Sequence, residues 1–360
     1  MLRRQMHIVL ASTARARGGT WRHVEDVGVQ LSARGHRVTV GLLPAARELQ
    51  AAATSAGLVW RPLLRTLRTD ADVWHLHLHD TFEATALALL ALRRPFGAAI
   101  VTEHLPRTPG SDPDLAGDGE RSRGADLART AFKRAQNALT ARTVVPSHGA
   151  ARFVMRRYRL GPADVVVAYN GVASFPARVP ALTGAGLEVV TVGALIDQKG
   201  LDVLLAAASR SRHPWGITIV GAGPQRAQLE RMATTLAPGR ARFAGWSDDP
   251  SAYLRASHVL CMPSRYESFG YAAVEASSWG RPVVGSRIDG LEEVVVPGRT
   301  GILVEPGDPD ALAAALDGLW NDLDTLAALG RAAREHARRL FTIERNVDAL
   351  LALYDDIGAG

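Results

Sequence analysis

Residues 263–286 read PSRYESFGYAAVEASSWGRPVVGS, and their order predicts a loop, a short helix and then a strand. Gly270 is expected to open the helix and Gly280 to close it. Glu267 then lies in the loop at the helix mouth, and Glu275 lies one turn inside the helix. Amides at a helix N-terminus carry partial positive charge that suits a phosphate group. This element can therefore offer amides to a diphosphate and two carboxylates to hydroxyls beside it. The alternative is a capped helix with two solvated glutamates.

Short apolar runs alternate with helical patterns on both sides of this stretch. Such alternation predicts βαβ units and a parallel sheet. The pattern pauses at residues 173–186, which contain two prolines and two glycines. A chain of 360 residues also exceeds the size at which a single core usually stops growing. We therefore predict an α/β fold with two Rossmann-like domains facing across a cleft.

The expected strands of the first half are residues 7–12, 37–43, 73–78, 98–104, 142–145 and 165–169. Those of the second half are residues 189–193, 217–221, 242–245, 259–262, 282–286 and 302–304. The expected helices include residues 20–34, 81–92, 201–209, 225–236, 251–256 and 271–279. Residues 107–124, rich in Pro, Gly and Asp, form a long loop without periodicity. Ligands of open α/β sheets bind at the carboxyl ends of the strands, so residues at those ends are the site candidates.

Composition excludes several classes of protein. Apolar residues make up 47% of the chain, which suits a globular protein and is too high for a disordered one. The single cysteine, Cys261, rules out an internal disulfide and is expected to be a buried strand residue. No apolar run approaches the ~18 residues of a membrane span. The short apolar stretch after Arg4 is expected to be the first strand rather than a signal peptide, so we expect a cytoplasmic protein.

Charge is divided unevenly along the chain. Residues 1–172 contain 24 basic and 14 acidic side chains, and the remainder contains 18 and 22. A basic first half suits an anionic or lipid-linked acceptor and peripheral contact with the inner membrane face, although a solvated arginine-biased surface is the alternative. Residues 111–120 carry four carboxylates, which instead suit a cationic acceptor such as an aminosugar natural product. No nucleic-acid-binding motif is present, so a nucleic-acid partner is not expected.

Only two of the 42 basic residues are lysines, Lys133 and Lys199. Lys199 occurs in VGALIDQKG, residues 192–200, just after an expected strand. An ammonium there can stabilise a departing diphosphate, whereas the alternative is a surface lysine. Residues 221–223, Gly-Ala-Gly, also follow a strand but lack the third glycine of a dinucleotide-binding fingerprint. This break disfavours an NAD-dependent dehydrogenase.

The first half has a glycine turn and histidines at strand ends. Gly18 and Gly19 follow the first strand, where glycines let a ligand approach the backbone closely; a plain tight turn is the alternative. His75, His77 and His79 alternate along one strand, so their side chains share a face. Polar packing is favoured over a metal site there, because no acidic ligand is clearly placed with them.

Taken together, these features resemble the retaining glycosyltransferases of family 4, which have the GT-B fold. The resemblance covers nearly the whole chain, and its strongest part runs from Glu267 to Glu275 and on through GRPVVGS. It continues through Gly-Leu-Glu-Glu-Val at residues 290–294 and the glycine-rich stretch at 298–304. Residues 169–172, YNGV, and the Gly-Gly turn also fall where the family has them.

The resemblance implies a role for each matching residue. The implied donor-binding set is Gly18, Gly19, Lys199, Glu267, Ser268, Phe269, Gly270, Tyr271 and Glu275. Within it, Glu275 holds the ribose, Lys199 stabilises the diphosphate and Gly19 approaches a phosphate. His104, at the end of an expected strand, matches the histidine that contacts the transferred sugar, so the catalytic set is His104, Lys199 and Glu267. The expected acceptor-binding set is His79, Asp80 and Asn170.

The implied reaction moves a hexose or N-acetylhexosamine from a nucleotide-diphosphate sugar, with UDP favoured, to a hydroxyl acceptor in glycan, glycolipid or natural-product biosynthesis. It retains the anomeric configuration and needs neither a metal ion nor a resident cofactor. The implied acceptor domain is residues 1–172 together with a returning helix at 343–360, and the donor domain is residues 173–342. Apolar residues within 347–354 have the spacing that such a helix needs.

One departure from the family pattern concerns the diphosphate. The family often has arginine where this chain has Ala194, so one of two expected cations is missing. A sugar-nucleotide-binding protein without transfer activity is therefore one alternative. A GT-B enzyme of another type, an epimerase or a phosphorylase, is the other, and the shortage of lysines disfavours a pyridoxal-dependent phosphorylase.

Overall fold

The computed structural model describes residues 4–78, 83–94, 99–104 and 123–358. The chain divides into two compact units. Unit 1 comprises Met1–Ala173 and Ile343–Gly360, and unit 2 comprises Ser174–Thr342. Residues 173–186 contain no helix or strand and lead into the first strand of unit 2.

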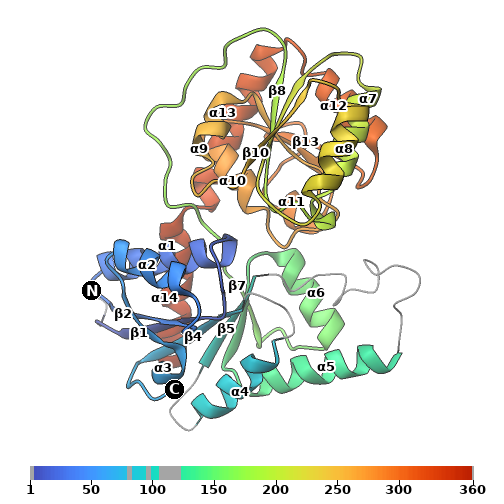
Figure 1. Cartoon of the computed structure of the whole chain (residues 1–360). Coiled ribbons are helices and arrows are strands. Elements are labelled where there is room, and N and C mark those ends of the chain that lie inside the picture. Colours follow the sequence, from blue (N-terminus) through green and yellow to red (C-terminus); the bar gives the residue numbers. More distant parts are fainter. Residues whose placement is uncertain (1–3, 79–82, 95–98, 105–122, 359–360) are drawn as a thin grey trace. The chain divides into compact units, whose positions relative to one another are not determined.

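Unit 1 is built on a seven-stranded sheet in the order β3-β2-β1-β4-β5-β6-β7, with every pairing parallel (Figure 1). Its strands are β1 (His7–Ser12), β2 (Arg37–Leu42), β3 (Val59–Pro62), β4 (Val73–Leu78), β5 (Ala99–Glu103), β6 (Arg142–Val145) and β7 (Val165–Val167). Its helices are α1 (Gly19–Ala33), α2 (Arg47–Ser55), α3 (Leu63–Thr66), α4 (Ala84–Arg93), α5 (Arg123–Ala138), α6 (His148–Tyr158) and α14 (Ile343–Gly358). The central strands β1 and β4 are buried along almost their whole length, which explains their continuous apolar runs.

The last helix of the chain, α14, packs on unit 1. Val347, Leu350, Leu351 and Tyr354 recur at helical spacing, are at most 1% exposed and join the core under α1, β1 and β2. The Tyr354 hydroxyl also hydrogen-bonds Nδ1 of His75 on β4, at 2.7 Å. Burying a large apolar side chain contributes roughly 1.5–3 kcal/mol, so this face fixes the returning helix that the apolar spacing predicts.

Unit 2 repeats the plan with a six-stranded parallel sheet in the order β10-β9-β8-β11-β12-β13. Its strands are β8 (Glu188–Val192), β9 (Gly216–Val220), β10 (Ala241–Gly245), β11 (Val259–Met262), β12 (Val283–Ser286) and β13 (Gly301–Val304). Its α-helices are α7 (Leu201–Arg210), α8 (Arg226–Leu236), α9 (Ser251–Ala256), α10 (Tyr271–Ser278), α11 (Asp289–Glu292), α12 (Pro309–Asp317) and α13 (Leu323–Leu340), and Asp197–Lys199 form a 3-10 turn, η2. The two doubly wound sheets confirm the predicted fold class.

Each sheet has one point where the strand order reverses. In unit 1 the chain leaves β1 towards β2 and returns to its other side at β4, and in unit 2 it does the same at β8 and β11. Ligands of doubly wound sheets bind in the crevice outside the carboxyl ends of the strands at this switch point. The glycine turn follows β1, and the loops that carry Lys199 and Glu267 follow β8 and β11.

Some elements lie outside the predicted ones. The strand β3 is an edge strand with alternating exposed and half-buried residues that ends in proline, so it lacks an apolar run. The strongly polar α5 begins at Arg123, inside the range predicted as a loop, and residues 107–122 of that loop lie outside the described residues. Across the described ranges, no helix is both long and apolar enough to cross a membrane.

Candidate functional site

Two loops of unit 2 bring a cation and a carboxylate together at its switch point. Lys199, in the turn after β8, donates from Nζ to Oε1 of Glu267, in the loop after β11, at 2.5 Å. The Ser264 hydroxyl donates to the same oxygen at 2.9 Å. The Glu267 side chain is 7% exposed and the Lys199 side chain 22% exposed, so the ammonium is the more accessible partner. Two motifs that were predicted separately thus form one charged centre.

Backbone contacts lock these two loops in register. The Arg265 amide donates to the Gln198 carbonyl at 2.8 Å, and the Gln198 side chain donates to the Tyr266 carbonyl at 3.1 Å. Gly200 has a φ of 61°, and a Cβ there would lie 2.0 Å from the Pro263 carbonyl oxygen. Only glycine therefore permits the close approach that places Lys199 beside Glu267.

The helix α10 starts where the sequence predicts. Gly270 is its N-cap with a φ of 92°, and neither a side-chain cap nor an acidic residue occupies the first turn. Glu275 lies one turn inside and is half-buried. The short helix α11 presses on the preceding loop, since a Cβ on Gly290 would lie 2.5 Å from the Glu267 carbonyl oxygen. The N-terminus of α10 is thus fixed next to the ion pair.

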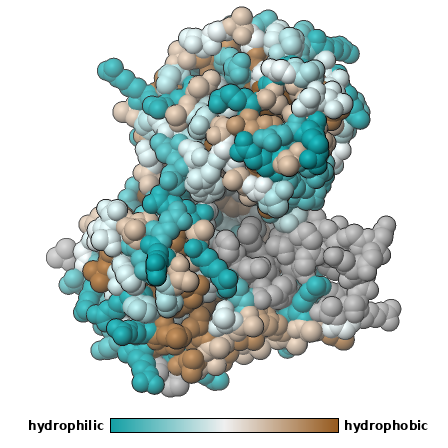
Figure 2. Space-filling view, viewed as in Figure 1, coloured by the Kyte–Doolittle hydropathy of each residue, from teal (hydrophilic) through white to brown (hydrophobic). Residues whose placement is uncertain are grey.

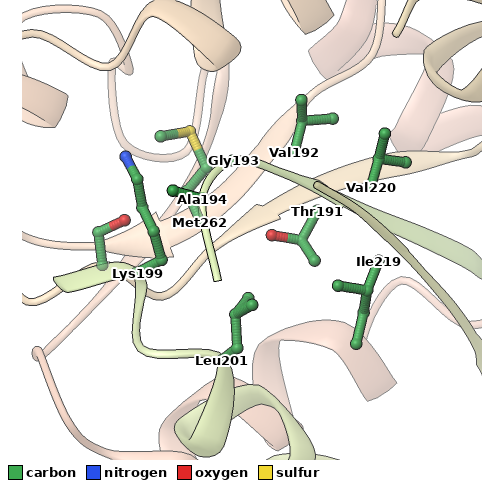
Figure 3. Close-up of a pocket in the computed structure, with 10 residues that line it drawn as sticks. Thr191, Val192, Gly193, Ala194, Lys199, Leu201, Ile219, Val220 and Met262 are labelled. Atoms are coloured by element: carbon green, nitrogen blue, oxygen red, sulfur yellow. The ribbon is translucent and has the colours of Figure 1, made fainter. Parts of the chain in front are cut away.

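Ala194 lines a small cavity of about 10 Å³ at the carboxyl end of β8, roughly the space of one water molecule. Figure 3 shows Lys199, Ala194 and Met262 along one side of it, with Ile219 and Val220 opposite. The expected second cation is therefore absent from this position. Arg265, in the loop after β11, does not replace it, because its guanidinium already bonds both carboxylate oxygens of Asp202, at 2.9 and 2.7 Å.

The Gly-Ala-Gly stretch after β9 has a packing role. A Cβ on Gly221 would lie 1.8 Å from the Gly193 carbonyl oxygen, and one on Gly223 would lie 2.4 Å from the Leu195 carbonyl oxygen. The Leu195 amide in turn donates to the Ala222 carbonyl at 2.9 Å. These glycines let the loop after β9 support the loop that leads to Lys199.

In unit 1, the glycine turn opens α1. Gly18 is the N-cap and Gly19 the first helical residue, and α1 has no side-chain cap and no acidic residue in its first turn. A Cβ added at either glycine would meet no atom of the described residues within 4 Å. Packing against the described part of unit 1 therefore does not require glycine here, in contrast to the close contacts at Gly200 and Gly290.

Three imidazole rings meet behind this turn. His104 follows β5, His77 lies near the end of β4, and His23 lies on α1, one turn after Gly19. The His104 ring centroid is 4.9 Å from that of His23 and 5.5 Å from that of His77. Burial lowers the pKa of His23 to about 4 and that of His77 well below its usual value, so both rings are neutral near pH 7. No sequence motif points to His23, because only the packing of α1 brings it to the strand ends.

His75 has a structural role, as the polar-packing alternative predicts. Its Nδ1 pairs with the Tyr354 hydroxyl and its Nε2 with the Thr102 hydroxyl, each at 2.7 Å. The third histidine of that strand pattern, His79, lies outside the described residues, as does Asp80.

The remaining acceptor candidate, Asn170, is only 7% exposed. It lies in a segment that α14 holds, because the Asn346 side chain donates to the Tyr169 carbonyl at 2.7 Å and the Ile343 amide donates to the Val172 carbonyl at 3.1 Å. Its role in binding the acceptor stays a prediction.

The fold and these strand-end features define a protein of two doubly wound units, of the kind that binds nucleotides at the switch points of its sheets. Residues 17–174 match the family model for Glycosyltransferase Family 4, and residues 186–322 match the model for Glycosyl transferases group 1. The chain thus carries a Glycosyltransferase Family 4 domain followed by a Glycosyl transferases group 1 domain, and it has the GT-B fold.

Among curated proteins, the chain is similar to the lipopolysaccharide core biosynthesis glycosyltransferase LpsE of Rhizobium meliloti, with 32% identity over 166 residues, which are 46% of this chain and 48% of LpsE. It is also 39% identical over 204 residues to a glycogen synthase of Mycobacterium tuberculosis, covering 54% of this chain and 49% of that protein. The matches thus span about half the length of these relatives.

Solved structures match over almost the whole chain. Anabaena Alr3699/HepE in complex with UDP and glucose aligns with a TM-score of 0.79 over 98% of this chain and 100% of that chain, at 18% identity. Sucrose-phosphate synthase from Thermosynechococcus elongatus aligns with a TM-score of 0.78 over 99% and 100%, at 22% identity. At this level of identity the likeness shows the fold.

Proposed function

We propose that the chain is a retaining glycosyltransferase that moves a hexosyl or N-acetylhexosaminyl group from a UDP-sugar to a hydroxyl acceptor. The observation that carries the proposal is the Lys199–Glu267 pair beside the N-terminus of α10. The Lys199 ammonium and the N-terminus of α10 can bind a diphosphate, and the Glu267 carboxylate beside them can accept hydrogen bonds from sugar hydroxyls. The complexes of Alr3699/HepE with UDP and with UDP-glucose favour uridine as the base.

In this proposal the residues of unit 2 bind the donor. Glu275 holds the ribose hydroxyls, while Glu267 and the segment Ser268, Phe269, Gly270 and Tyr271 bind the donor sugar and the diphosphate. During transfer the bond between the anomeric carbon and the diphosphate oxygen breaks, a bond to the acceptor oxygen forms, and the proton of the acceptor hydroxyl passes to the departing diphosphate oxygen. Negative charge then develops on the UDP that leaves. Lys199 and the positive end of α10 stabilise that charge, so the step is proposed to need no metal ion and no resident cofactor.

The residues of unit 1 are proposed to act on the sugar and the phosphate. Gly18 and Gly19 leave the start of α1 open to a phosphate oxygen, and His104 contacts the transferred sugar. Since burial keeps the neighbouring His23 and His77 neutral, they add no positive charge beside His104.

The acceptor is proposed to be anionic or lipid-linked. Arg134, Arg156, Arg157 and Arg159 line an open cavity of about 480 Å³ between α5 and α6. Apolar side chains also gather on unit 1 over α3 and α4 (Figure 2), where Leu64 and Leu92 are exposed. A basic cavity favours this acceptor class over the cationic one that residues 111–120 would suit, and those residues lie outside the described ranges. Salt-sensitive binding to anionic vesicles tests this part.

A nucleotide-binding screen tests the donor site. Thermal unfolding is followed with UDP, GDP and ADP for the wild type, for Glu275→Ala and for the matched exposed control Glu230→Ala on α8. A nucleotide at 100 times its Kd stabilises the protein by about 2.7 kcal/mol. For a domain of this size that corresponds to a rise in Tm of roughly 5–10 °C.

We expect this rise with UDP for the wild type and for Glu230→Ala, and its loss for Glu275→Ala. The absence of any shift in the wild type would favour a protein with a degenerate donor site, of which Ala194 would be the first suspect. The configuration of the anomeric carbon in the product glycoside, read by NMR, decides between retention and inversion.

A further inference from the structure

The three-histidine cluster of unit 1 has the geometry of a metal-binding site. One ring nitrogen from each of His23, His77 and His104 lies within 4.8 Å of the other two. His77 Nδ1 and His104 Nε2 are already 3.3 Å apart. Two imidazole nitrogens bound tetrahedrally to one Zn²⁺ at about 2.0–2.1 Å are roughly 3.3 Å apart. One of the three nitrogen pairs therefore has the required spacing, and the third ligand needs only a small side-chain adjustment.

Two buried nitrogen atoms of the cluster lack hydrogen-bond partners within the described part of the chain. They are Nδ1 of His23 and Nε2 of His77. An unsatisfied buried polar atom destabilises the fold, so such an atom calls for an explanation. His75 stands in contrast, because both of its nitrogens are paired; its ring centroid lies 4.2 Å from that of His77. Nδ1 of His23 is thus available as the third ligand, beside the close pair of His77 Nδ1 and His104 Nε2.

The ligand set also indicates the class of ion. Three imidazole ligands suit Zn²⁺, Co²⁺, Ni²⁺ or Cu²⁺, whereas Mg²⁺ and Ca²⁺ prefer oxygen ligands. The rings come from helix α1, from strand β4 and from the residue that follows the neighbouring strand β5, and the sheet and the core fix the backbones of these elements. His104 is the most exposed of the three, with 8% against 2% for His23 and 0% for His77, so an ion would enter past it.

We propose that His23, His77 and His104 bind one transition-metal ion of the Zn²⁺ class, and that the bound ion withdraws His104 from the sugar. The ion and the sugar then compete for one imidazole, so the metal inhibits transfer. This second half rests on the proposed function, whereas metal binding does not. The site is distinct from the proposed transfer step, which uses no metal ion.

A titration of the full chain with Co²⁺ alone tests the site directly. Tetrahedral Co²⁺ absorbs visible light more strongly than the hydrated ion, so the spectrum reports its coordination. The variants are His23→Gln and His77→Gln, and the matched control is His213→Gln, a histidine of unit 2 that stacks on Trp320. Each protein is first checked for cooperative thermal unfolding. If His77→Gln does not fold, His23→Gln on α1 carries the test.

We expect one equivalent of Co²⁺ to bind to the wild type and to His213→Gln, and affinity to fall at least tenfold in either cluster variant. Zn²⁺ should displace the Co²⁺ and bleach the band. No tetrahedral spectrum in the wild type, or equal affinity in the folded cluster variants, overturns the proposal.

Inhibition is measured separately, once a donor has been found. Zn²⁺ should inhibit sugar transfer by the wild type, a chelator should restore it, and UDP binding to unit 2 should be unaffected. Full activity of the Zn²⁺-loaded protein would overturn the competition for His104. If Co²⁺ binds as expected but no sugar is transferred under any condition, the metal site stands and the proposed function fails.

Discussion

Replacing Gly19 by alanine tests whether this glycine is needed for the fold or for the approach of a ligand. Gly19 is the first residue of α1, and an added Cβ would meet no atom within 4 Å among the residues that the structure describes. Alanine is favoured over glycine in a helix by about 0.5–1 kcal/mol. The change should therefore leave unit 1 as stable as before or raise its Tm by roughly 1–4 °C, since 1 kcal/mol shifts Tm by about 2–4 °C in a domain of this size.

The same methyl group should damage transfer. We assume that a phosphate oxygen lies within hydrogen-bond distance of the backbone at Gly19. An added Cβ would push this oxygen outwards, because the contact distance between a methyl carbon and an oxygen is longer than a hydrogen bond. A misplacement of about 1 Å can reduce the rate 10²-fold. We therefore expect kcat/KM for the UDP-sugar to fall about 10²-fold in a protein that is no less stable. Steady-state kinetics and thermal unfolding of the same preparation measure both quantities.

Gly28→Ala is the matched control on the same helix. Its added Cβ would lie 3.0 Å from Cδ1 of Leu58, so whether that side chain shifts decides the sign of the stability change, whereas the kinetics of the folded protein should stay unchanged. The reasoning would be refuted if Gly19→Ala kept a kcat/KM within twofold of the wild type. A loss of activity that merely followed a loss of stability would refute it equally.

Three further changes test unit 2 and the core of unit 1. Ala194→Arg restores a second cation and should tighten UDP binding about tenfold or more, because a hydrogen bond to a charged group contributes about 1.5–3 kcal/mol; the uncharged Ala194→Gln should not. Gly290→Ala forces a methyl against the Glu267 carbonyl oxygen, so calorimetric titration should show UDP binding lost, and normal binding would count against the loop geometry. Lys133→Met leaves the buried Glu103 carboxylate without its cation, so the free energy of unfolding should fall by about 3–5 kcal/mol. Adding Glu103→Gln should recover most of this loss, and an unchanged Tm in Lys133→Met would contradict the reasoning.

Much of the fold follows from apolar patterning alone. The strands His7–Ser12, Val73–Leu78, Arg142–Val145 and Val259–Met262 have the bounds that the sequence predicts. They are short apolar runs between turn residues, and most are buried on both faces, so their residues carry a strong signal. The edge strand Val59–Pro62 was not predicted, because a strand that is exposed on one side does not need a continuous run of apolar residues.

The site was harder to predict wherever tertiary packing decides the role of a residue. His23 is a polar residue on an amphipathic helix, and nothing in the sequence places its ring against His77 and His104. The glycines at 221 and 223 look like part of a nucleotide-binding motif, but they are required by the neighbouring loop. Local sequence constrains the backbone, whereas these roles depend on residues that are far away along the chain.

Lysine is rare in this chain, but its rarity alone does not show which of the two lysines meets a substrate. Each forms an ion pair with a glutamate that follows or ends a parallel strand, Lys133 with Glu103 and Lys199 with Glu267. By sequence and by chemistry the pairs are alike. Their exposure separates them, because the Lys133 side chain is 1% exposed and that of Lys199 is 22% exposed. A cation that cannot reach solvent cannot meet a substrate, so Lys133 fixes α5 on β5, whereas Lys199, at the switch point beside a helix N-terminus, is placed to meet an anion.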